Sequence, residues 1–566
     1  MSLEEPRTIP FPPFFKGVDH LTQPSFLAQG FVSKAKNIEF ERGVAKQRKG
    51  FQARTFDDSG VMSAAGGLPL ADASAVIGIA LMWPATESGA EVEVYFDQNK
   101  AYLYNYADGT VNSLFDDTDG GVDIDCFVGS SKQVSWTIAP INKAGAVQPT
   151  LVFTDGLEYN SQHTIYEFDG ATIYSDNNPA TALSESRITM SDIGTDFQYA
   201  KQIMWFSDHF MIGDYATDGA RYRNRVGWGD FQELGIVTAG DDNGEYIISD
   251  AEGFLLRMIR LGPHLAIYFN ESIVICDRVP TDDIYAFDVR VHGTGALAAN
   301  AVANIGRGLH VFLGNDDVYA YDGGLAPEPI GDAVAKHILD SVNPDSVDTI
   351  VTQHLPLDNL VRWFLPIEAA TQPNAVLVFN YREKTFSSLG KVAKTITSVG
   401  VGTRTASARC NDTQFVGVAC NAGGLGACSS YYRRGGFAAP LLGANDGEVY
   451  EILESTTTDD GTAIVSELEG PSEFIGEVYG DQGAVVEVKV ESKGAAFEME
   501  YSTDHGETWT PISGSFGGFT KFTLERIAVA KIISSFFMLR VIMENSTTQI
   551  KYMSARRKTM SSRGVN

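Results

Sequence analysis

A hairpin pattern recurs along most of the chain and limits the folds that it can adopt. Between about residues 75 and 455, a short run of β-branched and aromatic residues meets a tight polar turn, and a second such run follows. Examples are residues 92–104, 266–275, 309–321 and 441–452. Asn, Asp and Gly in these turns supply the positive φ that hairpin loops require. The pattern predicts consecutive antiparallel hairpins.

The hairpins recur at long, fairly regular intervals. The apolar residues at or near each turn are separated by 57, 57, 59, 43, 67 and 63 positions, and they are Phe96, Phe153, Phe210, Phe269, Phe312, Phe379 and Leu442. Several short strands per interval of this length are typical of a β-propeller. We therefore expect an all-β chain with an irregular six- or seven-bladed propeller over residues 61–455. One short helix is expected at residues 333–339, capped by Asp332.

The two ends of the chain differ from this repeat. Residues 1–60 begin with prolines interleaved with phenylalanines, which predicts an extended N-terminal arm that packs on its own domain or on a neighbouring subunit. Residues 456–553 alternate apolar and polar positions in several runs and predict a C-terminal β-sandwich. Residues 554–566 form a basic tail, expected either to be solvated or to dock on an acidic neighbour.

Charge and composition exclude several classes of protein. The chain has 566 residues and a formal net charge of −29, which excludes a simple DNA-coating role because such a protein needs cations facing the phosphates. A hydrophobic content of 44% is enough for a packed core. The five cysteines form no C-x-x-C pair, the N-terminus lacks the features of a signal peptide, and no apolar run is long enough to span a membrane. We expect folding in a cytoplasm, without disulfides or a membrane span.

Motif searches give no catalytic site. The phosphate-binding loop, the H-E-x-x-H zinc helix and the G-x-S-x-G nucleophile turn are all missing from the sequence. One acidic cluster has enough carboxylates to hold calcium, but its spacing does not match the twelve-residue calcium-loop pattern. A solvated or channel-facing loop is therefore favoured. Its members are Asp116, Asp117, Asp119, Asp123 and Asp125. We expect no cofactor, no metal and no enzymatic activity.

One motif resembles a feature of glycosidases. Residues 502–509 match S-x-D-x-G-x-T-W, the Asp-box of sialidases and related propellers, and its defining positions are Ser502, Asp504, Gly506, Thr508 and Trp509. These residue types suit a β-turn in which Asp504 accepts hydrogen bonds from nearby backbone N–H groups. We interpret the motif as structural, since no arginine triad and no activated tyrosine can be placed beside it.

Several short motifs together resemble the tail nozzle proteins of short-tailed bacteriophages, also called tail hub or packaged-DNA stabilising proteins. The resemblance covers about residues 16–455. It rests on the order of residues 35–51 (AKNIEFERGVAKQRKGF), 224–231 (NRVGWGDF), 309–322 (LHVFLGNDDVYAYD) with 329–332, 376–386 (VLVFNYREKTF) and 447–451 (GEVYE). The C-terminal sandwich has no counterpart in this pattern.

The resemblance implies a structural virion protein of the tail. It implies a homo-hexameric ring attached below the portal and adaptor proteins, which would retain the genome and then pass it during ejection, with tail fibre or tailspike proteins as neighbours. Genomic double-stranded DNA would be a partner in transit, without tight binding. The acidic cluster would then face the channel, and the basic residues near the C-terminus would dock on other tail proteins; these are Lys551, Arg556, Arg557, Lys558 and Arg563. The alternatives are a receptor- or glycan-binding tail adhesin and, more remotely, a sialidase-like glycosidase.

Overall fold

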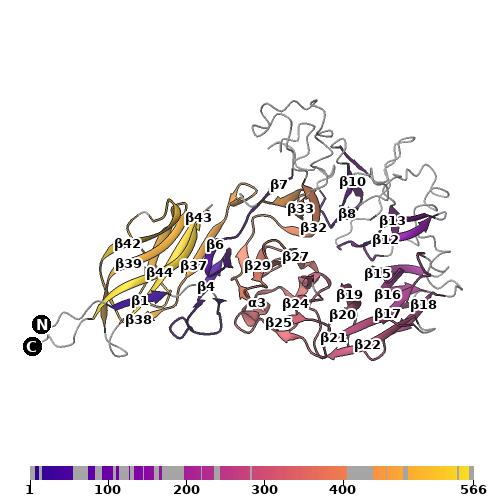
Figure 1. Ribbon diagram of the computed structural model, residues 1–566, viewed down its shortest axis with the longest axis horizontal. Coiled ribbons are helices and arrows are strands. Elements are labelled where there is room, and N and C mark those ends of the chain that lie inside the picture. The colour runs from indigo at the N-terminus through magenta and orange to yellow at the C-terminus, as the bar shows by residue number, and fades with distance from the viewer. Residues whose placement is uncertain are drawn as a thin grey trace, which may run out of the picture.

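Seven antiparallel sheets among the described residues follow one another around a ring and form a β-propeller (Figure 1). The computed structural model describes residues 7–11, 16–54, 74–82, 92–105, 110–113, 127, 133–143, 146–157, 165–168, 197–217, 220–234, 242–280, 284–306, 308–404, 437–453, 456–475, 482–514, 516–544 and 547–559. In five of these seven sheets, each strand is hydrogen-bonded to the next strand in the sequence, as the recurring hairpin turns require. The propeller expected from the sequence is confirmed, with seven blades.

The strands of the first four blades run in chain order. Blade 1 holds β8 (Gly78–Met82), β9 (Val92–Phe96), β10 (Ala101–Asn105) and β11 (Thr110–Ser113). Blade 2 holds β12 (Ser135–Lys143), β13 (Ala146–Thr154) and β14 (Tyr166–Phe168). Blade 3 holds β15 (Phe197–Phe206), β16 (His209–Thr217), β17 (Ala220–Trp228) and β18 (Gly244–Ile247). Blade 4 holds β19 (Leu255–Leu261), β20 (His264–Phe269), β21 (Ser272–Arg278) and β22 (Tyr285–His292).

The remaining blades complete the ring. Blade 5 holds β23 (Val302–Asn304), β24 (His310–Leu313), β25 (Val318–Tyr321) and β26 (Glu328–Pro329). Blade 6 holds β27 (Val351–Leu355), β28 (Leu360–Leu365), β29 (Ala375–Asn380), β30 (Thr385–Phe386) and β31 (Gly390–Lys391). Blade 7 holds β32 (Ile396–Arg404), β33 (Phe437–Ala444), β34 (Val449–Ile452) and β7 (Phe51–Ala53), extended by β35 (Thr458–Asp459) and β36 (Thr462–Ala463).

The regular spacing seen in the sequence has a structural origin. Each of the seven apolar residues that defined it lies in a different blade. Six of them lie on the second strand of their blade, whereas Phe379 lies on β29, the third strand of blade 6. This difference of one strand lengthens the interval before Phe379.

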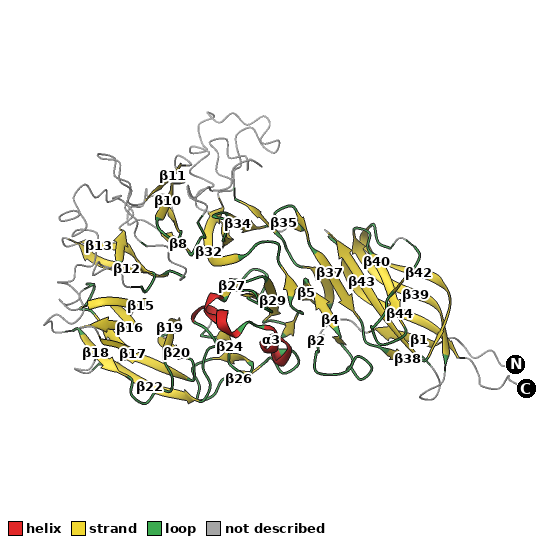
Figure 2. Ribbon diagram, turned by 180° about the vertical axis from the view of Figure 1, so that it is seen from behind, coloured by secondary structure: helices red, strands yellow, loops and turns green. Residues whose placement is uncertain are grey.

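Helical structure in the described residues is confined to three short elements beside blades 5 and 6 (Figure 2). They are η1 (Ala299–Ala301), α3 (Ala335–Ser341) and η2 (Pro344–Thr349). The expected helix therefore exists, and Val334 and Ile338 are buried as its pattern predicts. Its expected cap is wrong, because the N-cap is Val334 and no side chain caps the helix.

Two six-stranded sheets form the expected C-terminal β-sandwich. One has the order β42 (Phe519–Ser534), β39 (Gly483–Gly494), β44 (Gln549–Thr559), β6 (Val44–Gln47) and β5 (Ile38–Glu41), with β1 (Arg7–Phe11) also on β44. The other has the order β4 (Lys34–Lys36), β37 (Val465–Glu469), β43 (Phe536–Glu544), β40 (Glu498–Ser502) and β41 (Thr510–Pro511), with β38 (Glu473–Phe474) also on β43. Two short strands, β2 (Gly17–Val18) and β3 (Phe31–Val32), pair in parallel nearby.

The described residues near both ends of the chain lie in the sheets. The expected N-terminal arm packs on its own chain, since β1, β4, β5 and β6 belong to the sandwich sheets and β7 belongs to blade 7. Strand β44 continues to Thr559, within the expected basic tail, and pairs with both β39 and β1. Extended segments with alternating side chains predict strands, but they do not identify the strands with which they pair.

The N-terminal strand β7 closes the propeller ring. It pairs with β34 through Phe51↔Ile452 and Ala53↔Tyr450, and the Phe51 and Tyr450 rings lie 5.2 Å apart. Gly50 precedes this strand at a place where an added Cβ would lie 2.0 Å from the Thr458 carbonyl oxygen. A side chain at position 50 would thus force β7 away from β35.

Buried ion pairs tie the N-terminal strands to the propeller. Arg362 on β28 donates to Glu39 on β5 across 2.6 Å, and both side chains are almost fully buried. Arg48 donates to Asp459 at 2.8 Å and to Asn37 at 2.8 Å. One hydrophobic core extends across the same boundary and includes Trp363 and Leu539. The sandwich and the propeller are therefore packed as one unit (Figure 1).

Candidate functional site

The candidate channel-facing residues cannot be placed. Asp116, Asp117, Asp119, Asp123 and Asp125 lie outside the described residues. Their orientation toward a channel stays a prediction.

The candidate docking residues lie mostly on strand β44. Lys551 pairs with Glu491 at 2.9 Å, Arg556 with Glu487 at 3.9 Å, and Arg557 donates to the Phe474 carbonyl at 3.2 Å. Lys558 belongs to the same strand, whereas Arg563 lies outside the described residues. Lys551, Arg556 and Arg557 therefore make contacts within the sandwich.

The Asp-box is the loop of the hairpin that joins β40 and β41. The Asp504 carboxylate accepts hydrogen bonds from the Thr508 N–H at 2.9 Å and from the Ser502 hydroxyl at 2.6 Å. The Ser502 oxygen in turn accepts from the Gly506 N–H at 2.9 Å. The hydrogen bonds from Ser502 and Thr508 hold the pKa of Asp504 well below its usual range. Asp504 thus stays ionised and serves the turn, so it is poorly suited to act as a general acid.

Trp509 anchors the end of this loop. The Arg540 guanidinium lies 4.3 Å from the centre of the Trp509 ring, and its Nε donates to Glu500 at 2.8 Å. These contacts fasten the loop to β43 and β40. The structural interpretation of the motif agrees with this geometry.

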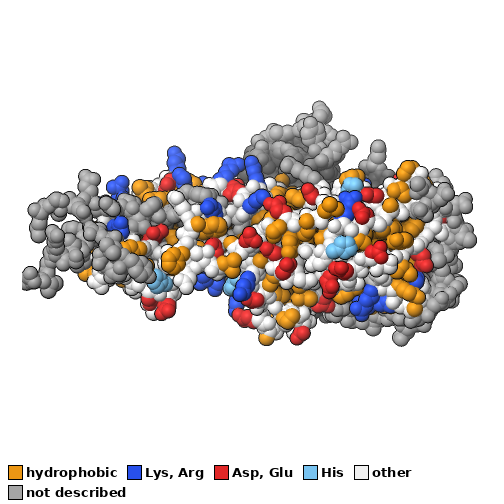
Figure 3. Space-filling view, turned by 90° about the horizontal axis from the view of Figure 1, so that it is seen from below, with side chains coloured by type: hydrophobic (Ala, Val, Ile, Leu, Met, Phe, Trp, Pro, Cys, Tyr) orange, Lys and Arg blue, Asp and Glu red, His pale blue; other side chains and the backbone are white. Residues whose placement is uncertain are grey.

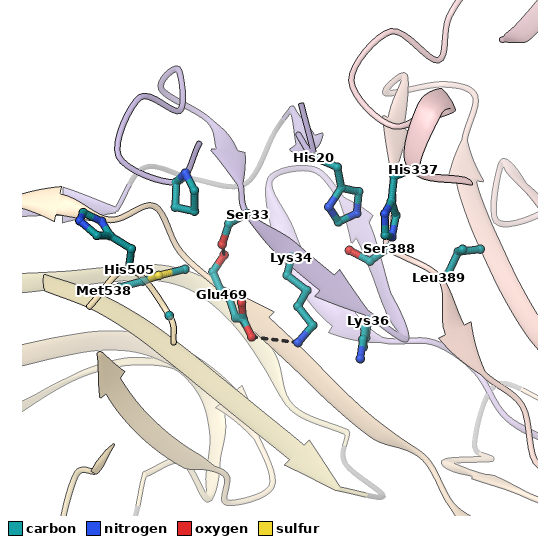
Figure 4. Close-up of a pocket in the computed structure, with 12 residues that line it drawn as sticks. His20, Ser33, Lys34, Lys36, His337, Ser388, Leu389, Glu469, His505 and Met538 are labelled. Atoms are coloured by element: carbon teal, nitrogen blue, oxygen red, sulfur yellow. Dashed lines mark hydrogen bonds and ion pairs between the residues drawn. The ribbon is translucent and has the colours of Figure 1, made fainter. Parts of the chain in front are cut away.

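The Asp-box loop borders a cleft of about 320 Å³ between the sandwich and the propeller (Figure 4). The loop contributes His505 and Gly506, the N-terminal segment contributes His20, Lys34 and Lys36 among others, and blade 6 and α3 contribute Ser388, Leu389 and His337. Figure 4 shows His20 beside His337, with His505 at the opposite end of the cleft. The cleft is therefore built from three regions that are far apart in the sequence.

Three ionisable groups of the cleft have shifted pKa values: His20, His337 and Lys34. Burial and the neighbouring His337 lower the pKa of His20 to about 4, and the two rings lie 4.3 Å apart. Burial also lowers the pKa of His337. Burial disfavours the charged form of Lys34, but hydrogen bonds and charges from Glu467 and Glu469 outweigh it and raise the lysine pKa. At neutral pH, His20 and His337 are neutral and Lys34 is a paired cation.

This cleft lacks the arrangement of a catalytic centre. Its Ser33 hydroxyl donates to the carbonyl oxygens of Glu469 and Gly470, both at 3.1 Å, so no base activates it. Across the described parts of the chain, no group of three or more His, Cys, Asp or Glu side chains is placed to hold a metal ion. Cys276 is buried, and burial raises the pKa of its thiol.

Two Tyr–Glu–Arg groups bear on the glycosidase alternative. Tyr215 donates to Glu245 at 2.7 Å and Arg225 donates to the same carboxylate at 3.1 Å, while Arg54 donates at 2.6 Å to Glu93, which also accepts from Tyr95. Both tyrosines are fully buried. Burial raises the pKa of Tyr215, which is opposite to the change that an activated nucleophile requires.

Charges of both signs are mixed on one face of the molecule (Figure 3). On the face in Figure 3, acidic side chains are interspersed with basic and apolar ones along both domains. Within the part of the chain that the structure describes, no helix has the length and apolarity needed to cross a bilayer.

Comparisons with known proteins add little to this description. No model of a protein family matches the chain, and no curated protein matches it. Among solved structures, the chain is similar to the crystal structure of BBS1N in complex with ARL6DN, soaked with lead, with 9% identity and a TM-score of 0.36 over 72% of this chain and 98% of that chain. A likeness of this extent carries no argument about function.

The cleft was missed by the sequence analysis. Its histidines are scattered singly at positions 20, 337 and 505, and no motif links them. The Asp-box was the one sequence motif that could have indicated the position of the cleft, because its loop forms one wall of it.

Proposed function

We propose that this chain is a structural subunit of a bacteriophage tail nozzle. Six copies would form a ring below the portal and adaptor proteins, and the ring would hold the genome and then pass it during ejection. Tail fibre or tailspike proteins would attach to the same ring in the virion. The proposal rests on the order of the motifs in residues 16–455 and, above all, on the net charge of −29.

The charge supports a conduit that DNA crosses without adhering. Six copies of −29 amount to −174, and like charges keep the phosphates of a sliding duplex away from the wall. The axial cavity of the propeller has a volume of only about 340 Å³, which is too small for a duplex. A duplex would therefore pass between subunits, through the centre of the ring.

Strand β42 is the surface that we assign to subunit contact. It has 16 residues and ends its sheet, with β39 on one side and no partner among the described residues on the other. Phe522, Leu524 and Ile533 on this strand are exposed. A long apolar edge strand pairs readily with another chain, and a head-to-tail contact of this kind closes a ring.

The oligomeric state tests the ring. Light scattering of the purified protein should give roughly six times the 61.3 kDa subunit mass, either alone or with the adaptor protein added. Leu524→Asp combined with Ile533→Asp should yield monomers, whereas Leu357→Asp on an exposed propeller turn should not. A protein that stays monomeric alone and with the adaptor would contradict the proposal.

Duplex binding tests the conduit. A gel-shift assay should detect no retention of double-stranded DNA at low salt, where electrostatic attraction would be strongest. Changing the five aspartates of the acidic cluster to Asn should increase retention in the assembled ring. Tight binding by the unmodified ring would contradict the proposal.

One observation favours the adhesin alternative. Tyr246 and Phe287 stack with ring centres 4.9 Å apart and planes 2° from parallel, and Tyr246 is 47% exposed. Such exposed aromatic pairs provide flat apolar faces of the kind that sugar rings contact. A glycan array should discriminate, since the adhesin predicts binding that Tyr246→Ala removes and the nozzle predicts none.

A further inference from the structure

A cavity lies on the axis of the propeller, where the innermost strands of the blades meet. It has a volume of about 340 Å³ and is lined by residues from β8, β12, β15, β19, β27 and β32, together with η1. These strands surround the centre of the ring in Figure 1. Its polar lining includes Gln133, Gln202, Arg257, Asn300 and Thr352. The volume lies in the range of ordinary small-molecule sites.

Arg257 on β19 is the one charged side chain among the described residues that line this cavity. Its Nη1 donates to the carbonyl oxygens of Ala299 at 3.2 Å and Val302 at 3.3 Å. A guanidinium has five N–H donors, so three remain after these two hydrogen bonds. Those three have no hydrogen-bond partner in the described part of the protein.

The surroundings of Arg257 supply no negative charge. No carboxylate of a described residue pairs with its guanidinium. The nearby Tyr268 and His310 are neutral at pH 7, because burial raises the pKa of the phenol and lowers that of the imidazole to about 4. Burial lowers the pKa of Arg257 to about 10, which leaves the guanidinium charged at neutral pH.

Three arginines that are more deeply buried than the partly exposed Arg257 show what it lacks. Arg48, Arg54 and Arg362 are each less than 9% exposed, and each donates to a carboxylate: Asp459, Glu93 and Glu39 respectively. Buried charges are costly unless they are paired. Arg257 differs from them in lining an open cavity without a carboxylate partner among the described residues.

We propose that the axial cavity binds a small organic carboxylate, with its anionic group on Arg257 and its apolar body against the aliphatic side chains of the inner strands. The planar guanidinium fork matches a carboxylate, which accepts two parallel hydrogen bonds. Ile79, Val351 and Val399 supply the apolar walls. Phosphate fits less well, since it carries up to two negative charges and finds a single cation here.

Ligand-observed NMR and calorimetry at constant ionic strength test this site with three probes. Butanoate should bind, whereas butanamide, which has the same shape without the charge, should bind at least tenfold more weakly. Inorganic phosphate should also bind more weakly than butanoate. Absence of butanoate binding, or equal binding of butanamide, would overturn the site, and tighter binding of phosphate would overturn its assignment to carboxylates.

Two variants locate the binding. Arg257→Met should weaken butanoate binding at least tenfold, and Arg260→Met, an exposed position on the same strand, should leave it unchanged. Because Arg257→Met removes an uncompensated charge, its melting temperature without ligand should equal or exceed that of the unmodified protein. Unchanged butanoate binding by Arg257→Met would overturn the proposal. The comparison of butanoate with butanamide tests it without any variant.

Discussion

The ion pair between Glu39 and Arg362 gives a sharp test of how the N-terminal strands are held on the propeller. Glu39→Gln removes the negative charge and keeps a side chain of almost the same shape. Arg362 then stays buried in blade 6, at 1% exposure, without a counter-charge. The expected effect is a large loss of stability where β5 contacts β28.

The magnitude follows from the burial of both partners. Removing one member of a buried pair costs about 3–5 kcal/mol, because the other charge stays desolvated. At about 1.4 kcal/mol per tenfold change, the equilibrium constant for detachment of β5 and β6 from the propeller should rise by roughly two to four orders of magnitude. The double variant Glu39→Met/Arg362→Met should recover most of this loss, since replacing both partners by apolar residues is often nearly neutral. Glu39 Oε2 and Arg362 Nε have no hydrogen-bond partner, which makes the original pair an imperfect one.

Native-state hydrogen exchange measures this opening without assuming two-state unfolding of a large chain. The amides of β5 and β6 should lose protection in Glu39→Gln, whereas those of blade 3 should not. Glu328→Gln serves as the control, because its pair with Lys384 is more than 60% exposed on both sides and is expected to contribute less than about 1 kcal/mol. Unchanged protection of β5 in Glu39→Gln, or a double variant as unstable as the single one, would refute the reasoning.

Three further predictions concern the junctions of the fold. Gly50→Ala should lower the melting temperature and expose residues near β7 to proteolysis, because its Cβ would meet the Thr458 carbonyl; unchanged proteolysis would contradict the close approach. The pKa of His20 is lowered to about 4, so its contribution to the free energy of unfolding is full above pH 6.5 and is lost as the pH falls from 6.5 toward 4. His20→Gln should therefore reduce the pH dependence of the free energy of unfolding between pH 4 and 6.5, as urea titrations at several pH values would show. Asp504→Asn should speed cleavage of the β40–β41 loop without altering the sandwich amides, and equal cleavage rates would count against the role of its hydrogen bonds.

The local elements were predictable because their signals are local. Turn residues and alternating runs predicted β9 with β10, β24 with β25, and β33 with β34 in antiparallel pairs. One residue per blade recurred closely enough to predict a propeller of six or seven blades. The exact number of blades was not predictable from the spacing, because Phe379 lies on the third strand of its blade and makes the intervals uneven.

The pairing of the N-terminal strands was not predictable from pattern alone. Ala45 lies opposite Ile550 and Lys36 lies opposite Glu467, across separations of several hundred residues. An alternating strand fits many edges equally well, so only tertiary packing selects one. The same holds for Arg48 and Arg362, which are buried ion-pair partners in the structure although no local pattern indicates this.

The candidate sites also differ in whether they depend on local or on long-range contacts. The Asp-box turn was predictable, because the side-chain hydrogen bonds of Ser502 and Asp504 join residues within four positions of one another. The cleft beside it and the axial cavity were not, because each collects residues from distant parts of the chain.

The closure of blade 7 by β7 has a consequence for synthesis of the chain. Residues 34–53 leave the ribosome early, but β34, β37 and β44 follow only after several hundred residues. At about 5–20 residues per second, a gap of roughly 500 residues leaves strand edges waiting for about 25–100 s. A chain released before β44 would lack the partner of β1 and one of the two partners of β6, so translation errors that shorten the product would yield copies unable to complete the sandwich. Completion of the sandwich thus depends on strands that are made several hundred residues apart.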